Sequence, residues 1–467
     1  MSLSVQDAAR EAPRRPALVA PPLRWTYAEL AAEVAAETAR LEALGARGAA
    51  RVAFAPQARP ASLVRLLALI ELGVPAVLLP RGARPAERAA MLAAAAPALD
   101  LDAPPAGVPA PRTAPATTHA PPDDGRPLAV VFTSGTSAAP KGVVLSRSAF
   151  VASAAAHAAH LGWRPDDRWL LCLPPARVGG LSVLTRCLLA RAPVVLSAGT
   201  SGAEIADALD TGQATIVSLV PELLERLLAL DPPWRPHVRL RAILLGGAPA
   251  SAALLERAAQ RRLPVLATYG LTETCSQVAT QEPGTPPSPE QGCGRPLPGI
   301  SVRIVDGAIQ VRGPVLLSGY LPAGAHPHPV TPDGWLLTQD LGALDAEGRL
   351  HVHGRADEMI VTAGEKVAPG EVERALEQCP GIARALVFGV AGAAGSELVA
   401  ALLVPGPDLP PSDAELLAAL GRLLPRSRIP RLVAYVAELP AGPAGKPRRG
   451  DLAARYGHRL RALGPPR

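Results

Sequence analysis

Short apolar runs alternate with longer segments of helical periodicity over most of the first 270 residues of this chain. Short apolar runs predict buried strands, and the amphipathic segments between them predict helices. Strands that alternate with helices are typical of parallel sheets covered by helices. The predicted strands are 52–54, 74–79, 128–132, 169–173, 194–196, 216–219, 242–245 and 265–268. The predicted helices are 61–72, a segment from about 84, 148–160, 222–230 and 250–260.

The start of one further helix is marked by a capping pattern. Thr26 precedes an Ala- and Leu-rich segment that runs to about residue 44, and Glu29 follows three residues after Thr26. Threonine and glutamate at this spacing form a capping box, in which each side chain accepts a hydrogen bond from the other residue's backbone N–H. Gly45 predicts the end of this helix.

The pattern changes after about residue 302, where short strands and turns continue to about residue 352. The last hundred or so residues predict a small α+β domain. Residues 101–127, rich in Pro, Ala and Thr, predict a linker or surface loop. We therefore expect an α/β protein with a large N-terminal domain of stacked parallel α/β sheets plus a β-rich portion, followed by a small C-terminal α+β domain.

Length and composition exclude several classes of protein. A chain of 467 residues, 48% of them hydrophobic, is long enough for two or more domains. The most apolar window, 63–79, contains Arg65 and Glu71 and predicts no membrane span. The first 15 residues lack the apolar segment of a secretory signal. The five cysteines are scattered without metal or redox spacing, which favours a reducing, cytoplasmic location.

The net charge of +6 does not by itself indicate nucleic-acid binding, because the basic residues are spread along the chain and only Arg448 and Arg449 form a local pair. Lysine is rare: of the 47 basic residues, only Lys141, Lys366 and Lys446 are lysines. A lysine kept in a chain that otherwise uses arginine indicates a site that a planar guanidinium does not suit. Chance retention explains any one of them equally well.

The stretch 128–145 is the first candidate for ligand chemistry. An apolar strand leads into a run of Thr, Ser, Gly, Ala and Pro that ends at Lys141 and Gly142. Small residues let a backbone approach phosphate oxygens, oriented amides bind anions, and a lysine adds a compact charge. It is not a Walker loop, because no Ser or Thr follows Lys141 and a second strand, 143–145, replaces the helix. A hairpin with a small-residue turn is the alternative.

A glycine pair and a short polar turn follow two later strands. Gly246 and Gly247, at the end of a predicted strand, allow a planar ring to lie against the backbone, although such turns are common. The run 269–277 reads YGLTETCSQ. Within it, Glu273 is a candidate ligand of Mg²⁺, and Thr272 is a candidate donor to a phosphate or carboxyl oxygen. A capped helix start would give the same pattern.

Asp340 and Arg355 are candidates for contacts with a nucleoside. An aspartate accepts from both hydroxyls of a ribose diol, and an arginine donates to the same ring or to a phosphate. A surface ion pair would explain either residue alone.

In this order the segments resemble the motifs of the adenylate-forming superfamily of acyl-CoA synthetases, luciferases and peptide-synthetase adenylation proteins, over nearly the whole chain. The chain departs from that pattern at Ala138, Gln339 and Ala363, which stand where the family usually has glycine. All three lysines fall within these motifs, which favours retention for function. The resemblance assigns nucleotide or cofactor contacts to Thr133, Ser134, Gly135, Thr136, Ser137, Lys141, Gly246, Gly247, Ala248, Pro249, Tyr269, Gly270, Thr272, Asp340, Arg355, Gly364 and Lys446.

The resemblance implies an AMP-forming acid–thiol ligase that uses ATP, Mg²⁺ and CoA. A carboxylate attacks the α-phosphate of ATP, pyrophosphate leaves, and a thiol then displaces AMP from the acyl-adenylate. The implied catalytic residues are Lys446, Thr272, Glu273 and Lys141, with Glu273 as the metal ligand. Preorganised positive charge is what this chemistry requires, since two anions must meet.

The resemblance also implies two domains. The expected boundaries are 1–354 for the large adenylation domain and 355–467 for a small mobile domain, with a hinge near 355–357 at Asp357.

Within the superfamily, the segments 167–174, 180–182, 243–247 and 269–277 resemble the o-succinylbenzoate:CoA ligases of menaquinone biosynthesis. Arg177 stands where that group usually has histidine. Because the substrate has two carboxylates and only one is activated, we expect Arg177 to bind the other; an arginine directed to solvent is the alternative. The expected substrate residues are Arg177, Gly180, Ser182 and Ser276.

Other functions stay open. The chain could activate another aryl or fatty acid, load a carrier protein in place of CoA, or bind nucleotide without catalysis. A metal centre at the His351/His353 or His326/His328 pairs is disfavoured, since no Cys or carboxylate adjoins them in sequence. The expected partners are a small carboxylic acid, ATP and CoA, with no nucleic acid and no membrane span; homo-oligomerisation is left open.

Overall fold

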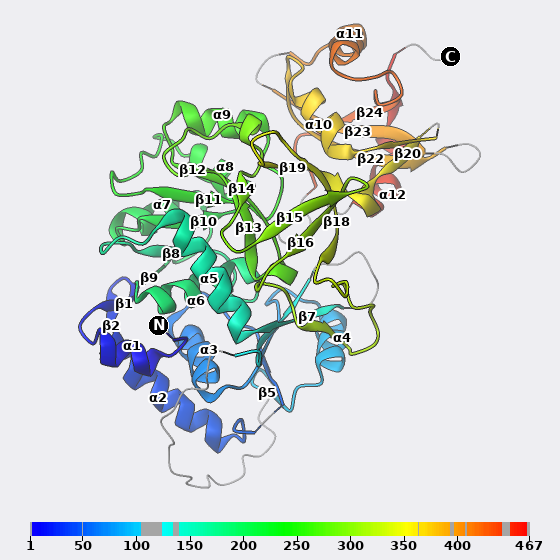
Figure 1. Cartoon of the computed structure of the whole chain (residues 1–467). Coiled ribbons are helices and arrows are strands. Elements are labelled where there is room, and N and C mark those ends of the chain that lie inside the picture. The colour runs from blue at the N-terminus through cyan, green and yellow to red at the C-terminus, as the bar shows by residue number, and fades with distance from the viewer. Residues whose placement is uncertain are drawn as a thin grey trace.

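A large α/β part is followed by a smaller C-terminal part, which lies at the upper right of Figure 1. This computed structural model describes residues 2–48, 50–103, 124–133, 140–362, 364–392, 397–406, 409–440 and 449–464. The α/β class expected from the alternation of strands and helices is confirmed.

The first sheet has six strands, and its central strands are parallel. The order is β17 (Gly319–Leu321), β7 (Gly142–Ser146), β6 (Pro127–Phe132), β4 (Ala76–Leu78), β3 (Val52–Phe54) and β5 (Leu99–Asp100). Pairing is parallel for β3–β4, β3–β5 and β4–β6, and antiparallel for β6–β7 and β7–β17. The antiparallel edge therefore contains the strands on either side of the predicted phosphate loop.

The second sheet has nine strands with a parallel centre from β1 to β12. Its order is β14 (Arg295–Pro296), β13 (Ser276–Thr280), β12 (Val265–Leu271), β11 (Ala242–Leu245), β10 (Ile216–Leu219), β8 (Trp169–Leu171), β9 (Val194–Leu196), β1 (Pro16–Ala20) and β2 (Leu23–Thr26). The strands β13 and β14 are added antiparallel beyond β12.

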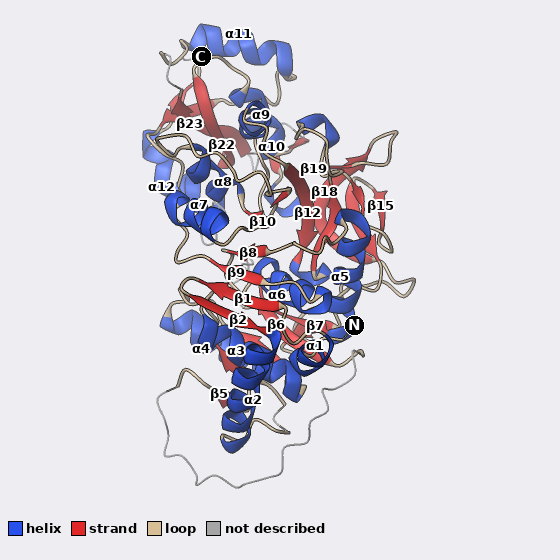
Figure 2. Ribbon diagram, turned by 90° about the vertical axis from the view of Figure 1, so that its left-hand side faces the viewer, coloured by secondary structure: helices blue, strands red, loops and turns tan. Residues whose placement is uncertain are grey.

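The two sheets share one layer of helices, because residues of both sheets pack into the same central core. Alternate residues of a strand point to opposite faces of its sheet, so the central strands also contribute to separate outer cores. Val52 and Trp169, from different sheets, both belong to the central core, whereas their neighbours Ala53 and Leu170 face separate outer cores. Helices lie on both sides of the strands (Figure 2). The central core includes α1 (Val5–Glu11), α2 (Tyr27–Ala43), α3 (Pro60–Leu72), α5 (Arg147–Leu161) and α6 (Val178–Ala190). The outer helices are α4 (Pro85–Ala95) on the first sheet and α7 (Gly202–Thr211), α8 (Pro221–Leu228) and α9 (Ala252–Gln260) on the second.

The β-rich portion is a third, antiparallel sheet of four strands. Its order is β15 (Ser301–Val305), β16 (Ala308–Arg312), β18 (Leu336–Leu344) and β19 (Leu350–Arg355). The predicted domain boundary falls at the last residue of β19; that boundary and the mobility of the C-terminal domain stay predictions.

The C-terminal part is a sheet with a core on each face, as expected for a small α+β domain. The sheet order is β22 (Ile382–Ala391), β23 (Glu397–Pro405), β24 (Leu432–Tyr435) and β25 (Arg461–Ala462). Helices α10 (Pro369–Glu377) and α11 (Asp413–Leu423) cover one face and α12 (Leu452–Tyr456) the other, while β20 (Ile360–Thr362) and β21 (Glu365–Val367) form a hairpin beside them.

Most predicted elements are present, with ends that coincide or differ by up to three residues. The capping box of Thr26 and Glu29 is confirmed at the start of α2. Helices α6 and α7 were not predicted; in α6, the glycines at 179 and 180 resemble a turn. In the structure, glycine is required at position 180 by close packing and not by a turn. A Cβ there would collide with the carbonyl oxygen of Pro174, so glycine lets α6 pack against the preceding segment. Of the predicted loop 101–127, residues 104–123 lie outside the described part of the chain.

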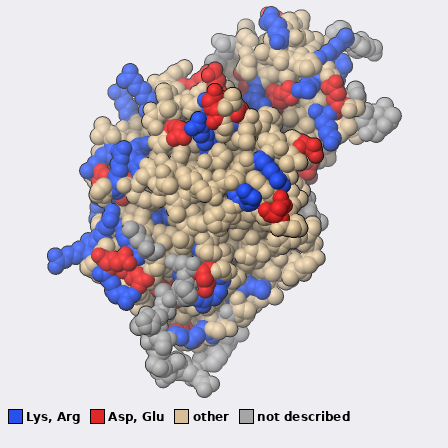
Figure 3. Space-filling view, viewed as in Figure 1, with Lys and Arg blue, Asp and Glu red and all other residues tan. Residues whose placement is uncertain are grey.

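None of the described helices is long and apolar enough to cross a membrane. On the face seen in Figure 3, Lys and Arg side chains (blue) are interspersed with Asp and Glu side chains (red). This face therefore lacks the continuous basic stripe that is typical of nucleic-acid-binding proteins.

Candidate active site

The ends of the predicted phosphate loop are fixed by the antiparallel pair β6–β7. Phe132 pairs with Gly142, and the backbone N–H of Thr133 donates to the carbonyl oxygen of Lys141 at 3.2 Å. Strands β6 and β7 thus pair as in the hairpin that was the alternative prediction for this stretch, and their pairing places Thr133 and Lys141 side by side. Ser134, Gly135, Thr136 and Ser137 lie outside the described residues, as does Ala138.

Lys141 and Glu273 meet at the side chain of Tyr320. The Nζ atom of Lys141 lies 3.7 Å from the centre of the Tyr320 ring, and the Tyr320 hydroxyl donates to Oε1 of Glu273 at 3.1 Å. Burial lowers the pKa of Lys141, although the nearby charge of Glu273 opposes this shift. Glu273 lies with Thr272 in the 3₁₀ turn η1 (Thr272–Thr274), which directly follows β12.

The predicted ribose group is assembled by the pairing of β18 with β19. Asp340 is the partner of Arg355 in the ladder, and their side chains approach to 3.7 Å between Oδ1 and Nη1. The hydroxyl of Tyr269 donates to Oδ2 of Asp340 at 2.6 Å, which joins the end of β12 to this pair. Burial, and then the charge of Asp340, raises the pKa of Tyr269, so the phenol keeps its proton for this bond.

Arg355 also contacts Asp357, the predicted hinge residue. Its Nε and Nη2 atoms donate to the two carboxylate oxygens of Asp357 at 2.8 and 2.9 Å, and Nη2 also donates to the side-chain oxygen of Gln339 at 2.8 Å. Asp357 and Gln339 therefore hold the guanidinium beside Asp340, and a bound ribose would have to share it.

Two close backbone approaches shape the predicted adenine side. A Cβ at Gly246 would lie 3.2 Å from the carbonyl oxygen of Thr268, so Gly246 packs closely against β12. Gly247 has a φ of +80°, a backbone conformation that favours glycine. Ala248 and Pro249 complete this turn before α9. At Gly270 a Cβ would collide with the carbonyl oxygen of Ser276, so glycine is required there.

A buried polar cluster supports the turn that carries Glu273. Cys275 and Ser276 have φ values of 50° and 96°, and the hydroxyl of Ser153 donates to the carbonyl oxygen of Cys275 at 2.9 Å. Arg186 donates to Ser153 at 3.0 Å and also to the side-chain oxygen of Gln277. The positive φ values are strained for these residue types, so helices α5 and α6 hold the turn in place through this cluster.

The predicted acid-binding residues lie at the start of α6. Arg177 is the N-cap residue, and its Nη1 atom donates to the carbonyl oxygen of Phe132 at 2.9 Å, directly before the phosphate loop. Burial alone lowers the pKa of Arg177, and none of the described carboxylates forms an ion pair with it. The Ser182 hydroxyl donates to the carbonyl oxygen of Gly179 at 3.0 Å within the helix.

The remaining predicted residues belong to the C-terminal part. Gly364, with a φ of +80°, lies in the turn between β20 and β21, and Lys366 is exposed on β21. Ala363 and Lys446 lie outside the described residues.

The donor set at Glu273 fits magnesium bound mainly through a nucleotide. Mg²⁺ in such sites usually takes one or two protein carboxylates, and phosphate oxygens and water complete its octahedron. Glu273 offers one carboxylate, and no described cluster of three or more His, Cys, Asp or Glu side chains could hold a metal without a substrate.

Comparison with known proteins agrees with this geometry. The family described as AMP-binding enzyme matches residues 5–321, and the AMP-binding enzyme C-terminal domain matches residues 371–446. The chain belongs to the AMP-binding enzyme family.

The relatives of this AMP-binding enzyme include 2-succinylbenzoate–CoA ligases from several bacteria. The 2-succinylbenzoate–CoA ligase of Bacillus mycoides is 33% identical over 335 residues, which cover 70% of this chain and 69% of that protein. The ligase of the same name from Listeria monocytogenes is 33% identical over 72% of this chain and 71% of its own length.

Solved structures match this AMP-binding enzyme over nearly its whole length. The o-succinylbenzoate CoA synthetase of Bacillus subtilis, in complex with its acyl-adenylate intermediate, has a TM-score of 0.83 and 29% identity, with 97% of this chain and 98% of that chain covered. ATP-bound MatB from Rhodopseudomonas palustris has a TM-score of 0.84 and 25% identity, with 98% and 99% covered.

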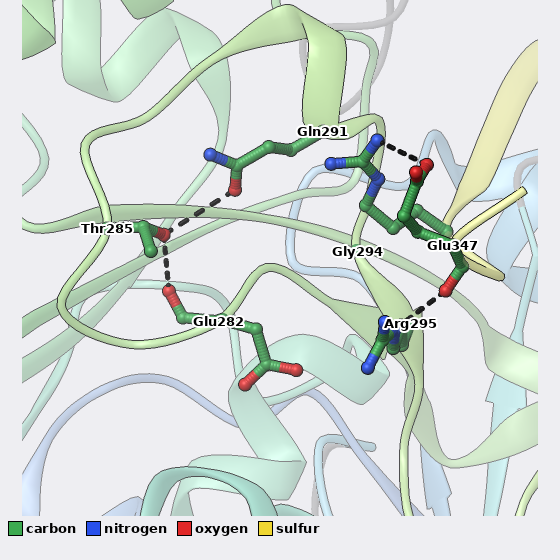
Figure 4. Close-up of a pocket in the computed structure, with 7 residues that line it drawn as sticks. Glu282, Thr285, Gln291, Gly294, Arg295 and Glu347 are labelled. Carbon is green, nitrogen blue, oxygen red and sulfur yellow. Dashed lines mark hydrogen bonds and ion pairs between the residues drawn. The ribbon is translucent and has the colours of Figure 1, made fainter. Parts of the chain in front are cut away.

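Figure 4 shows residues that line a separate pocket, whose volume is about 310 Å³. Its lining residues Glu347 and Arg349 lie in the turn between β18 and β19, at the other end of that ladder from Asp340. Its polar groups largely bond to one another: Arg295 donates to the carbonyl oxygen of Glu347 at 2.8 Å, and Arg349 pairs with the Glu347 carboxylate at 2.9 Å. The pocket therefore is not part of the candidate active site of this AMP-binding enzyme.

Sequence reasoning missed Tyr320 and Arg186. The chain contains only five tyrosines, and two of them, Tyr269 and Tyr320, donate to carboxylates of the candidate site. That scarcity was a usable signal. Arg186 carries no comparable signal, because arginine is abundant here and only the fold buries it.

Proposed function

We propose that this AMP-binding enzyme is a 2-succinylbenzoate:CoA ligase, which joins its acid to CoA with cleavage of ATP to AMP and pyrophosphate. The chain covers more than two thirds of curated ligases of that name, and it aligns with the o-succinylbenzoate CoA synthetase of B. subtilis over 97% of its length. We base the choice of acid on the position of Arg177.

Arg177 places a positive charge next to the phosphate loop without using it for an internal ion pair. The single described hydrogen bond of its side chain goes to the carbonyl oxygen of Phe132, the last residue of β6. A partly buried guanidinium that lacks a carboxylate is costly unless an anion binds there. A substrate with one carboxylate at the α-phosphate and a second at Arg177 supplies that anion, whereas a monocarboxylic acid does not.

In the proposed first half-reaction, an oxygen of the succinyl carboxylate attacks the α-phosphorus of ATP. The bond to the bridging oxygen breaks, and pyrophosphate leaves with the electron pair. Lys141 would contact the triphosphate, Asp340 would accept from the ribose hydroxyls, and Glu273 would hold the magnesium ion. Bound Mg²⁺ supplies charge that neutralises the phosphate oxygens.

In the second half-reaction, the CoA thiolate attacks the acyl carbon and AMP leaves. We propose that rotation of residues 355–467 about Asp357 separates the two steps, with Lys446 serving the first and the Gly364 turn the second. The contact of Arg355 with both Asp340 and Asp357 supports this coupling, since it links the ribose position to the hinge.

The decisive experiment is a pyrophosphate-release screen with aryl, dicarboxylic and fatty acids, each with and without CoA. We expect 2-succinylbenzoate to give the highest kcat/KM and product thioester to form only with CoA. A preference for a monocarboxylic acid, or acyl transfer to a carrier protein in place of CoA, would contradict the proposal.

The role of Arg177 is tested with the same assay. Arg177→Ala should raise KM for 2-succinylbenzoate about 100-fold, the loss typical of a charged hydrogen-bonded pair. It should change KM by less than about threefold for 4-oxo-4-phenylbutanoate, which keeps the succinyl carboxylate and lacks the carboxylate on the ring. Arg177→Lys should recover part of the loss, and Arg226→Ala, on the exposed side of α8, serves as the matched control. Equal effects on the two acids would refute the assignment.

A further inference from the structure

The segment 317–321 bonds to both motifs that we propose to contact the triphosphate. The backbone N–H of Leu317 donates to the carbonyl oxygen of Glu273, and that of Ser318 donates to the carbonyl oxygen of Val144, both at 2.9 Å. Strand β17 then pairs antiparallel with β7, which places Tyr320 opposite Val143. Tyr320 is therefore fixed in space relative to Lys141 and Glu273 by main-chain bonds.

The Tyr320 side chain lies between the two charges. Its ring faces the ammonium group of Lys141 at 3.7 Å, and its hydroxyl donates to Glu273 at 3.1 Å. The His326 ring contacts the same tyrosine edge-to-face at 5.9 Å. Among the described residues, Lys141 forms no ion pair with Glu273 within 4.0 Å, although the charge of Glu273 acts on the pKa of Lys141.

A direct pair between Lys141 and Glu273 would compete with the proposed substrate. An ammonium and a carboxylate attract strongly in a partly buried site, because water screens them poorly. Each would then have to leave the other before binding phosphate or metal. An aromatic face attracts a cation more weakly than a carboxylate does, and a phenol is a neutral donor to a carboxylate.

We propose that Tyr320 is a positioning residue of the adenylation half-reaction: its ring holds Lys141 and its hydroxyl holds Glu273, so that the two charges do not pair and remain available to the triphosphate and its divalent cation. This inference rests on the proposed function for the roles of Lys141 and Glu273. It assigns each half of the tyrosine side chain a separate task.

The two tasks predict different kinetic defects. Tyr320→Phe removes only the bond to Glu273, so the Mg²⁺ concentration for half-maximal pyrophosphate release should rise about tenfold, with KM for ATP at saturating Mg²⁺ within twofold. Tyr320→Leu also removes the ring, so KM for ATP should rise at least about tenfold as Lys141 pairs with Glu273. Neither change should alter KM for the acid by more than twofold.

The matched control is Tyr435→Phe, which removes a hydroxyl whose described bond goes to Pro411 in the C-terminal part. It should leave three constants unchanged: the Mg²⁺ concentration for half-maximal pyrophosphate release, KM for ATP and KM for the acid. If the Tyr320→Phe protein keeps the wild-type magnesium dependence, or if all three constants of the Tyr320 variants worsen equally with a lower melting temperature, the inference is wrong. Should the leucine protein fail to fold, the phenylalanine protein alone decides.

Calorimetric titration with ATP and Mg²⁺ in the absence of any acid separates this inference from the proposed substrate. Wild-type protein that binds the nucleotide but does not activate 2-succinylbenzoate would contradict the proposed acid, and the Tyr320 comparison would still be decided by binding. Variants that bind ATP and Mg²⁺ as wild type does would overturn the role of Tyr320 and leave the proposed function intact.

Discussion

The buried cluster around Arg186 predicts that loss of the Gln277 side chain destabilises the protein more than loss of the Arg186 side chain does. Arg186 is 2% exposed, and its guanidinium bonds to Gln277 and Ser153 with no ion pair to any described carboxylate. Burial lowers its pKa to about 10. The difference from the ordinary arginine pKa corresponds to a cost of about 3 kcal/mol for keeping the charged group buried.

Arg186→Met removes that cost together with the two hydrogen bonds. Both acceptors keep other partners: the Gln277 oxygen stays 3.1 Å from Nδ1 of His157, and Ser153 still donates to Cys275. Replacing a buried charge with an apolar side chain of similar length is often neutral or stabilising. We therefore expect a change in the free energy of unfolding within about 1 kcal/mol.

Gln277→Leu should destabilise the protein, because it leaves the Arg186 guanidinium buried with one hydrogen-bond acceptor fewer. Loss of a bond to a buried charged group costs about 3 kcal/mol, and the bond from Gln277 to the Thr280 hydroxyl, 2.9 Å long, is lost as well. The glutamine variant should thus be less stable than the arginine variant by about 2 kcal/mol or more.

Urea unfolding followed by tryptophan fluorescence measures this difference, since Trp163 and Trp169 lie beside His157 in the same cluster. Arg226→Met, at an exposed and ion-paired arginine, is the control and should change stability by less than about 0.5 kcal/mol. A loss of 3 kcal/mol or more for Arg186→Met with a smaller loss for Gln277→Leu would refute this reasoning, because the guanidinium itself would then be the stabilising group.

Three further predictions concern the pH dependence and the two half-reactions. Burial raises the pKa of Glu377 from 4.5 to about 7, so its stabilising contribution is complete below the unfolded pKa and is lost as the pH rises through 7. Glu377→Gln should therefore stabilise the protein by about 3 kcal/mol at pH 8 and by almost nothing at pH 4 in melting curves. Asp340→Ala should raise KM for ATP about 100-fold while Asp340→Asn, which keeps an acceptor for Tyr269, should lose less; equal losses would show that the charge rather than the acceptor matters. Lys446→Ala should lower the rate of adenylation about 100- to 1,000-fold and spare thioester formation from added acyl-adenylate, and a parallel loss of both steps would contradict its role.

The central strands of the two large sheets were predictable because their residues alternate between two cores. Val52 and Ala53, for example, face different helical layers, and short apolar runs with that property can only be buried strands. The capping box of Thr26 and Glu29 fixed the start of α2 because its bonds are local. Helix α6 was missed for the opposite reason, since Gly180 is needed by the neighbouring backbone at Pro174 and not by a turn.

The residues of the candidate site were predictable, but the contacts between their side chains were not. Lys141, Glu273, Asp340 and Arg355 stand in segments whose residue types already indicate phosphate, metal and ribose contacts. The contact of Lys141 with Tyr320 depends on the pairing of β17 with β7, between strands that are far apart in sequence. No periodicity in the sequence specifies such a pairing.

The placement of Lys141 against Tyr320 makes this protein suited to chemical footprinting. Amine-directed reagents have only three lysine side chains to modify. Lys366 is exposed on β21 and should react quickly, whereas Lys141 is partly covered by the phenol ring and should react slowly. The ratio of labelled peptides in a mass spectrum would therefore report, at a single residue and without any assay of turnover, when a nucleotide covers Lys141.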